Sequence, residues 1–158
     1  MSKSKLIAAL SLSAVLAIGL GIAGTAVAAV NAQKVIDARQ AGFKQLGGAF
    51  KLMGDQFKAD TPDTKIIAAQ AKVMKDLARK LPHWFPVGTG VETGLKTGAK
   101  AEIWTDAATF ASAAKGLQVE TAKLEAVAKT GNMDAIKAQA NATGGACGTC
   151  HKKFRAKI

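Results

Sequence analysis

The sequence predicts an all-α fold, and more specifically a left-handed antiparallel four-helix bundle. Its apolar residues recur at three- and four-residue steps, as on one face of a helix, rather than alternating as they do in a strand. In two stretches, 36–57 and 103–124, large apolar residues also repeat every seven positions. A strict seven-residue repeat winds neighbouring helices into a left-handed supercoil with shallow crossing angles, which favours a bundle over a globin-like packing.

The N-terminal residues have the layout of a secretory signal. Lys3 and Lys5 are followed by 25 uncharged residues, and Ala26-Val27-Ala28 offers the small side chains that a signal peptidase requires. We therefore expect residues 1–28 to be a cleaved signal peptide, with a second possible cleavage site after Ala32. A retained membrane anchor is the alternative, because an uncharged run of this length could span a bilayer.

The remaining residues, 29–158, suit one domain of a protein exported to the periplasm. Two of the 22 Lys and Arg residues lie in the predicted signal peptide, so residues 29–158 carry nine more basic than acidic side chains. The lysines are scattered singly, and no Arg-rich run contains aromatic residues, which argues against a nucleic-acid partner. The positive charge instead favours an acidic protein partner or an anionic surface.

The first two helices are predicted from apolar spacing and from one capping motif. The seam of the first helix consists of Ile36, Phe43, Phe50 and Phe57, seven residues apart, with Leu46 and Met53 between them. Thr61-Pro62-Asp63 predicts the start of the second helix, with Thr61 as N-cap and Pro62 in the first helical position. The expected buried stripe of this helix is Ile66, Ile67, Val73, Met74 and Leu77.

The second helix is expected to end near Leu81-Pro82, and the proline- and glycine-rich stretch through Gly98 predicts one long crossover loop. A third helix is expected from about Ala101, with an apolar face of Ile103, Phe110, Leu117 and Leu124. Thr130-Gly131-Asn132 ends this helix and caps the fourth. One side of the fourth helix carries Met133, Ile136, Ala140, Cys147, Cys150, His151 and Phe154.

The chemistry of the chain is concentrated in Cys147-Gly148-Thr149-Cys150-His151. On a helix, the two cysteines and the histidine stand at i, i+3 and i+4, so their side chains share one face. Covalent haem attachment needs this arrangement, because two thiols must reach the two vinyl groups of a porphyrin while an imidazole lies beneath the iron. The motif predicts one covalent haem c per chain, bound through Cys147 and Cys150, with His151 as an axial iron ligand.

Three other interpretations of the two cysteines remain open. A disulfide would have poor geometry over a three-residue step within one helix, and it would leave His151 unexplained. A thioredoxin-like redox pair would require an α/β fold, which the apolar pattern does not predict. A zinc site would require a fourth ligand, and His83 is the only other histidine.

Several segments together resemble cytochrome c prime, the class II c-type cytochromes. The resemblance covers essentially the whole of residues 29–158. It includes the C-terminal haem motif and three further segments, Asp37-Ala38-Arg39-Gln40, Leu81-Pro82-His83-Trp84-Phe85 and Ala101-Glu102-Ile103-Trp104-Thr105-Asp106. The resemblance implies a four-helix bundle with haem c between helices, often a homodimer through the first two helices.

The resemblance also implies roles for individual residues. His151 would be the proximal ligand, Arg39 and Gln40 would lie near the haem propionates, and Arg155 would line the proximal side. In low-spin relatives of the cytochrome c556 kind, a methionine four residues after the first-helix arginine binds iron, and here that position is Phe43. Phenylalanine cannot coordinate iron, so we expect a distal face that Phe43 covers and a five-coordinate, mostly high-spin iron.

This interpretation predicts a haem protein without enzymatic activity that transfers electrons, binds nitric oxide or carbon monoxide, or does both. A low-spin electron carrier is the alternative. Its sixth ligand would come from His83, Met53, Met74 or Met133, with Met53 and His83 as the main candidates. Met53 lies ~15 Å along the helix from Phe43, so we expect it in the core instead. A bundle that performs thiol redox chemistry or binds another metal, without haem, is a third possibility.

Overall fold

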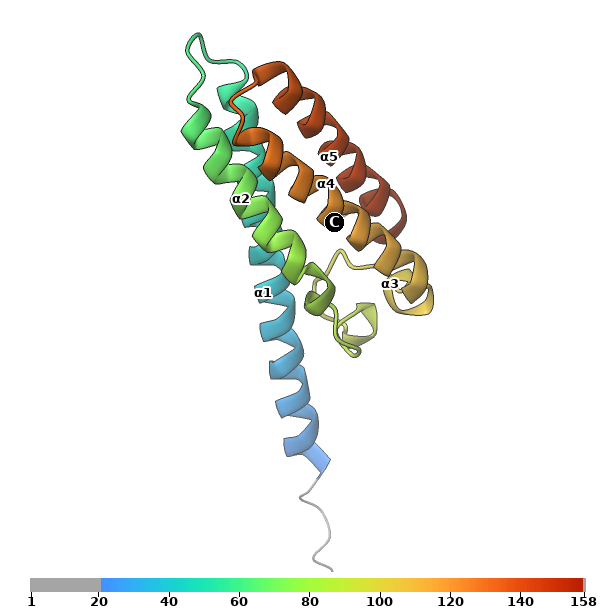
Figure 1. The fold of residues 1–158 in the computed structure, drawn as a ribbon. Helices are drawn as coiled ribbons and strands as arrows, with labels where there is room; N and C mark the ends of the chain where they lie inside the picture. Colours follow the sequence, from blue (N-terminus) through green and yellow to red (C-terminus); the bar gives the residue numbers. More distant parts are fainter. Residues whose placement is uncertain (1–20, 158) are drawn as a thin grey trace, which may run out of the picture.

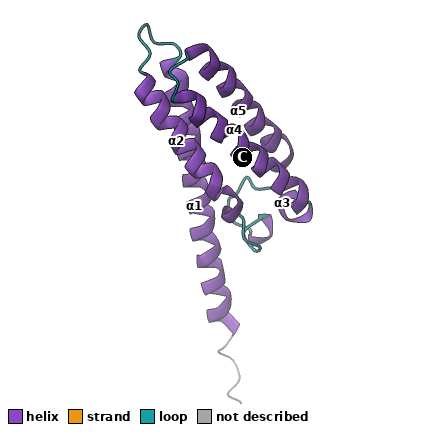
Figure 2. Ribbon diagram, in the orientation of Figure 1, coloured by secondary structure: helices purple, strands orange, loops and turns teal. Residues whose placement is uncertain are grey.

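The computed structural model describes residues 21–157, with side chains from residue 31 onward, and Figures 1 and 2 show a bundle of long helices. The helices are α1 (Gly21–Gln56), α2 (Thr64–Lys80), α3 (Glu102–Thr105), α4 (Ala107–Ala128) and α5 (Met133–Phe154). Within these residues no strand forms, and the only β pairing outside strands is an isolated antiparallel bridge between Ala99 and Arg155. The prediction of an all-α fold with four main helices is confirmed.

Helix packing leaves one seam of the bundle different from the others. Helices α1 and α2, α2 and α4, and α4 and α5 pack closely, backbone against backbone, whereas α1 and α5 do not form such a pair (Figure 1). Side chains contribute contacts across this seam, since a Cβ placed on Gly144 of α5 would lie 3.4 Å from the ring of Phe50 on α1. The α1–α5 seam is therefore held by side chains rather than by close backbone packing.

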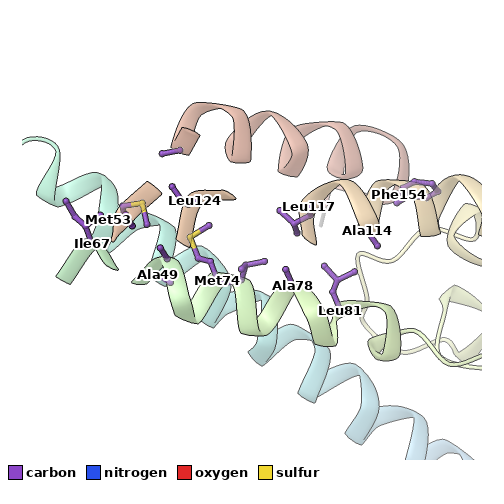
Figure 3. Packing of buried hydrophobic residues seen from close by; sticks show 14 of the residues in the cluster. Ala49, Met53, Ile67, Met74, Ala78, Leu81, Ala114, Leu117, Leu124 and Phe154 are labelled. Atoms are coloured by element: carbon purple, nitrogen blue, oxygen red, sulfur yellow. The ribbon is translucent and has the colours of Figure 1, made fainter. Parts of the chain in front are cut away.

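The core confirms the seven-residue repeats (Figure 3). All four predicted core residues of the third helix are buried: Ile103, Phe110, Leu117 and Leu124. On α1, Leu46 and Met53 are buried, and Phe43 and Phe50 are half-buried against the same cluster. Phe57, directly after α1, is half-buried against it as well. Met53 and Met74 are fully buried among apolar side chains, so their thioethers fill space in the core.

The start and the buried face of α2 differ from the prediction. Asp63 is the N-cap, not Thr61, because the Asp63 carboxylate accepts hydrogen bonds from the backbone N–H groups of residues 65 and 66. The buried face of α2 is also rotated relative to the predicted one, since Ile66 and Val73, which were expected in the core, are each 39% exposed. The buried residues are Ile67, Ala71, Met74 and Ala78. These four follow a 3.6-residue period, whereas Ile66 and Val73 each precede a buried position by one residue and fall on the next face.

The predicted third helix is interrupted at Asp106. This residue has φ −125° and ψ 54°, which lies outside the helical region, and its side chain accepts a hydrogen bond from Thr109 N. Asp106 therefore ends α3 and caps α4, so one predicted helix is two. The crossover also contains two short 3-10 segments, Leu81–Trp84 and Val91–Thr93, where a plain loop was expected.

Within residues 21–157 no helix combines the length and the apolar character needed to cross a bilayer. The predicted signal peptide, residues 1–28, lies largely outside the described residues. Its predicted cleavage site after Ala28 falls inside α1, and cleavage there stays a prediction.

An ion cluster around the buried Glu125 joins α2 to α4 and predicts a pH-dependent stability. Hydrogen bonds from Lys129 and Lys75, each 2.9 Å, lower the pKa of Glu125 to about 2. A carboxylate with a lowered pKa stabilises the fold above its unfolded pKa of about 4.3 and loses this effect as the pH falls toward 2. We expect Glu125→Gln to lower the Tm by a few degrees at pH 7 and to melt like the parent protein near pH 2.

Thermal unfolding followed by circular dichroism between pH 2 and 7 measures this difference. The control is Asp55→Asn, because Asp55 forms an exposed pair with Lys51 and should have little effect on the Tm. If Glu125→Gln lowered the Tm equally at pH 2 and at pH 7, the pH-dependent stability could not be assigned to the Glu125 carboxylate.

Candidate functional site

The last three turns of α5 carry the predicted haem motif. Asn132 caps the helix, its side chain accepting a hydrogen bond from Ala135 N, and the helix continues to Phe154 without a break. The motif is therefore helical, and Cys147, Cys150 and His151 share one face as predicted. Both cysteines are free, half-buried and packed against the core, whereas His151 is exposed.

The electrostatics of the two thiols differ from those of a redox pair. Burial raises the pKa of Cys147, and burial together with the neighbouring Cys147 raises the pKa of Cys150. Reactive dithiols work as thiolates and have lowered pKa values. Both thiols here stay protonated at neutral pH, so the site does not fit thiol redox chemistry.

His151 is suited to bind iron. Although the residue is exposed overall, its ring is partly shielded from solvent, which lowers its pKa, and the positive charge of Arg155 lowers the pKa further. The imidazole is therefore neutral at pH 7. Neutral imidazole is the form that binds a metal. Arg155 follows α5 directly, and its charge acts on His151. That it lines the proximal side of a haem stays a prediction.

The described part of the chain gathers no group of three or more His, Cys, Asp or Glu side chains that could hold a metal ion. The chemistry at the end of α5 is that of two neutral thiols and one neutral imidazole on a single helix face. This donor set fits a covalently attached haem, for which Cys147 and Cys150 would form the thioethers and His151 would bind the iron.

Arg39 lies on α1 and is 3% exposed. Its guanidinium donates to Trp84 O, to Thr89 O and Oγ1, and to Thr97 Oγ1, at 2.8 to 3.4 Å. It also stacks 4.7 Å from the centre of the Phe85 ring. Burial lowers the pKa of Arg39, and the negative charge of Glu92 partly opposes this effect. Arg39 therefore fastens the crossover to α1, a role that the sequence did not predict.

Gln40 continues the same attachment, since its Nε2 donates to Lys96 O at 3.0 Å. Both residues of the predicted Arg-Gln pair thus contact the crossover. Whether they also lie near haem propionates stays a prediction.

Phe43 stands one turn beyond Arg39 in an aromatic cluster. Its ring meets Trp84 edge-on at 5.1 Å and Phe85 at 6.1 Å. Gly42 permits this packing, because a Cβ there would lie 2.6 Å from the Trp84 ring. Phe85 in turn contacts Phe110 at 4.9 Å, which extends the cluster to α4.

The line of rings ends on the helix that carries the haem motif. Phe110 meets Phe154 at 5.3 Å, and Phe154 follows His151 by three residues. Side chains from α1, the crossover, α4 and α5 are thereby packed in one continuous series. This series is the structural connection between the predicted distal residue and the predicted proximal helix.

The other proposed iron ligands are dispersed. Met53 and Met74 are fully buried in the core, and Met133 is half-buried at the start of α5, more than three turns before the motif. His83 is exposed in the first 3-10 segment. The structure brings none of them to His151 as an evident partner.

Two residues that the sequence analysis missed, Thr89 and Thr97, hold Arg39 through their hydroxyl groups. No local pattern could reveal them, because threonine is common in loops and its partner here is 50 or 58 residues away. Trp84 was quoted for the family resemblance, but its contact with Gly42 was not foreseen.

The fold and the site together define a class of protein, a four-helix bundle with a C-terminal c-type haem motif. A protein-family model described as Cytochrome C' matches residues 34–155. The chain belongs to the cytochrome c' family, whose members are haem proteins and not enzymes.

Individual relatives agree with this assignment. Cytochrome c' of Rubrivivax gelatinosus is 35% identical over 122 residues, covering 77% of this chain and 94% of the relative. Cytochrome c' of Rhodospirillum rubrum is 39% identical over 107 residues, covering 67% and 71%. Cytochrome c-556 proteins, one of them from Agrobacterium tumefaciens, are also similar to the chain.

Solved structures share the fold. A nitric oxide complex of a cytochrome c prime variant from Alcaligenes xylosoxidans superposes with a TM-score of 0.72 at 29% identity, covering 80% of this chain and 97% of that one. A second cytochrome c', described as having an unusual ligand-controlled dimer dissociation, gives a TM-score of 0.74 at 26% identity with the same coverage.

Proposed function

We propose that this protein is a periplasmic cytochrome that carries one covalent haem c with five-coordinate, high-spin iron, transfers electrons and binds nitric oxide or carbon monoxide. Cys147 and Cys150 hold the haem, His151 is the axial ligand, and Phe43 covers the opposite face. The observation that carries this proposal is the identity of residue 43 on α1. It is a phenylalanine, which cannot bind iron, at the position where low-spin relatives have a methionine ligand.

The haem supplies the change between ferric and ferrous iron and the site for a gas. The chain supplies ligation, polarity and access. His151 would bind the iron through a neutral ring, and Cys147 and Cys150 would fix the haem on α5. The Phe43 ring offers no hydrogen-bond donor, so it would favour neutral diatomic molecules over charged ligands. The nitric oxide complexes of similar proteins support gas binding here.

A low-spin electron carrier is the second candidate, because cytochrome c-556 proteins are also similar to the chain. Burial of Met53 and Met74 in the core argues against either as a sixth ligand, and Met133 lies at the start of α5, more than three turns before the haem motif. This leaves the exposed His83. The absorption spectrum of the ferric protein decides between the two candidates. We expect high-spin bands, and a low-spin spectrum that His83→Ala converts to high-spin would replace this proposal with the alternative.

The outer face of the first two helices supports the predicted homodimer. Leu52 on α1 and Ile66 and Val73 on α2 are 39% to 50% exposed, so these two helices offer large apolar side chains to a second copy of the chain. A relative with a dimer has the same fold. Sedimentation should give the mass of a dimer, and Val73→Lys should shift it to that of a monomer; a monomeric parent protein would exclude this interface.

A further inference from the structure

We propose that Thr97 is a positioning residue that links Arg39 on α1 to the end of α5 where His151 lies. The proposal rests on the assignment of His151 as the iron ligand. It does not depend on whether a sixth ligand is present.

The crossover first reaches α5 through its backbone. Lys100 N donates to Phe154 O at 3.1 Å, and Ala156 N donates to Gly98 O at 2.9 Å. These bonds flank the bridge between Ala99 and Arg155. Residues 98–100 therefore pair with residues 154–156, which begin at the last residue of α5.

Arg155, in the middle of this paired segment, also donates a backbone hydrogen bond to His151 O at 3.1 Å. This bond closes the last turn of α5. Pairing to the crossover holds Arg155 in an extended conformation with φ −112° and ψ 125°. We infer that the orientation of the last turn of α5, and with it the orientation of His151, depends on the position of residues 98–100.

The same segment reaches α1 through one hydroxyl group. Arg39 Nη2 donates to Thr97 Oγ1 at 2.8 Å, and Ala99 N donates to the same oxygen at 3.1 Å. Thr97 thereby joins a buried cation on α1 to the residue that bridges to Arg155. The other crossover groups that accept from Arg39 belong to Trp84, near the start of the crossover, and to Thr89, in its middle.

The chemistry of Arg39 makes this link strong. Its guanidinium is buried, and all its hydrogen-bond acceptors in the described residues are neutral oxygens. A hydrogen bond from a charged donor is about twice as strong as a neutral one, and a buried donor that loses its acceptor is costly. Loss of the Thr97 hydroxyl should therefore release the segment 98–100 while the remaining bonds keep Arg39 in place.

The test compares Thr97→Val, which keeps the shape of the side chain and removes the hydroxyl, with Thr97→Ser, which keeps the hydroxyl. The matched control is Thr89→Val. It removes a hydroxyl that also accepts from Arg39, at 3.2 Å, but that has no bond to Ala99. All variants are made as full-length, haem-loaded protein. Two quantities are measured, namely the amide hydrogen exchange of Lys100 and Ala156 and the midpoint reduction potential.

We expect Thr97→Val to speed exchange at both amides at least about tenfold, which corresponds to about 1.4 kcal/mol of local stability. It should also shift the midpoint potential beyond the scatter of repeated titrations. Thr97→Ser should show the exchange rates and the midpoint potential of the parent protein. Thr89→Val should leave the exchange rates of both amides unchanged.

Unchanged exchange in Thr97→Val would overturn the proposal, and so would an equal effect of Thr89→Val. Faster exchange with an unchanged reduction potential would also overturn it, because the position of residues 98–100 would then have no effect on His151 and the iron. A low-spin ferric spectrum would refute the proposed five-coordinate iron and leave these exchange measurements valid, so the two failures are distinguishable.

Discussion

A variant with both Cys147→Ala and Cys150→Ala is expected to carry no covalently attached haem when it is produced with cytochrome maturation machinery. The two half-buried thiols are the only cysteines in the chain, and both are free and protonated. No other side chain can form a thioether to a vinyl group. Acid–acetone extraction followed by a pyridine haemochrome assay measures the attached haem, and we expect its complete loss.

The control for this experiment is Thr149→Ala. Thr149 lies between the two cysteines but is exposed, and its hydroxyl donates only to Gly145 O within the helix. It should retain one covalent haem per chain. Haem that resists extraction in the double cysteine variant would refute the assignment of the motif and revive a non-haem role for the cysteines.

Replacing Phe43 by alanine is expected to speed carbon monoxide binding to the ferrous protein at least about tenfold. If the Phe43 ring covers the open face of the iron, a ligand must displace it, and its packing against Trp84 and Phe85 resists that movement. A tenfold rate change corresponds to about 1.4 kcal/mol in the barrier. Flash photolysis of the carbon monoxide complex measures the rebinding rate.

Phe57→Ala is the matched control for the Phe43 variant. Phe57 follows Phe43 by two seven-residue steps on the same seam and is also half-buried against the core, but it lies beyond the end of α1. It should lower the Tm without changing the binding rate. Equal rates in the Phe43 variant and the parent protein would show that Phe43 does not control access.

Much of the fold could be predicted because its signals are local. The capping sequence at Asn132 and the seven-residue repeats act over a few residues, and the structure confirms them. The haem motif is local as well, since three side chains within five positions of a helix must share a face. The sequence therefore predicted which chemical groups come together at the end of α5.

The errors occurred where small or distant residues decide the structure. Ala71 and Ala78 are fully buried, but alanine gives no strong apolar signal, so the larger Ile66 and Val73 were assigned to the core in error. The attachment of Arg39 to the crossover depends on partners 45 to 58 residues away. Such contacts have no signature in the spacing of nearby residues.

The line of aromatic rings has a practical consequence for anyone who follows the unfolding of this protein. Both tryptophans of the chain, Trp84 and Trp104, belong to it, through contacts with Phe43 and Phe85. Intrinsic fluorescence therefore reports on the crossover end of the molecule, while circular dichroism averages over all the helices. If the two signals melt at different temperatures, the difference measures how independently the crossover opens from the rest of the bundle.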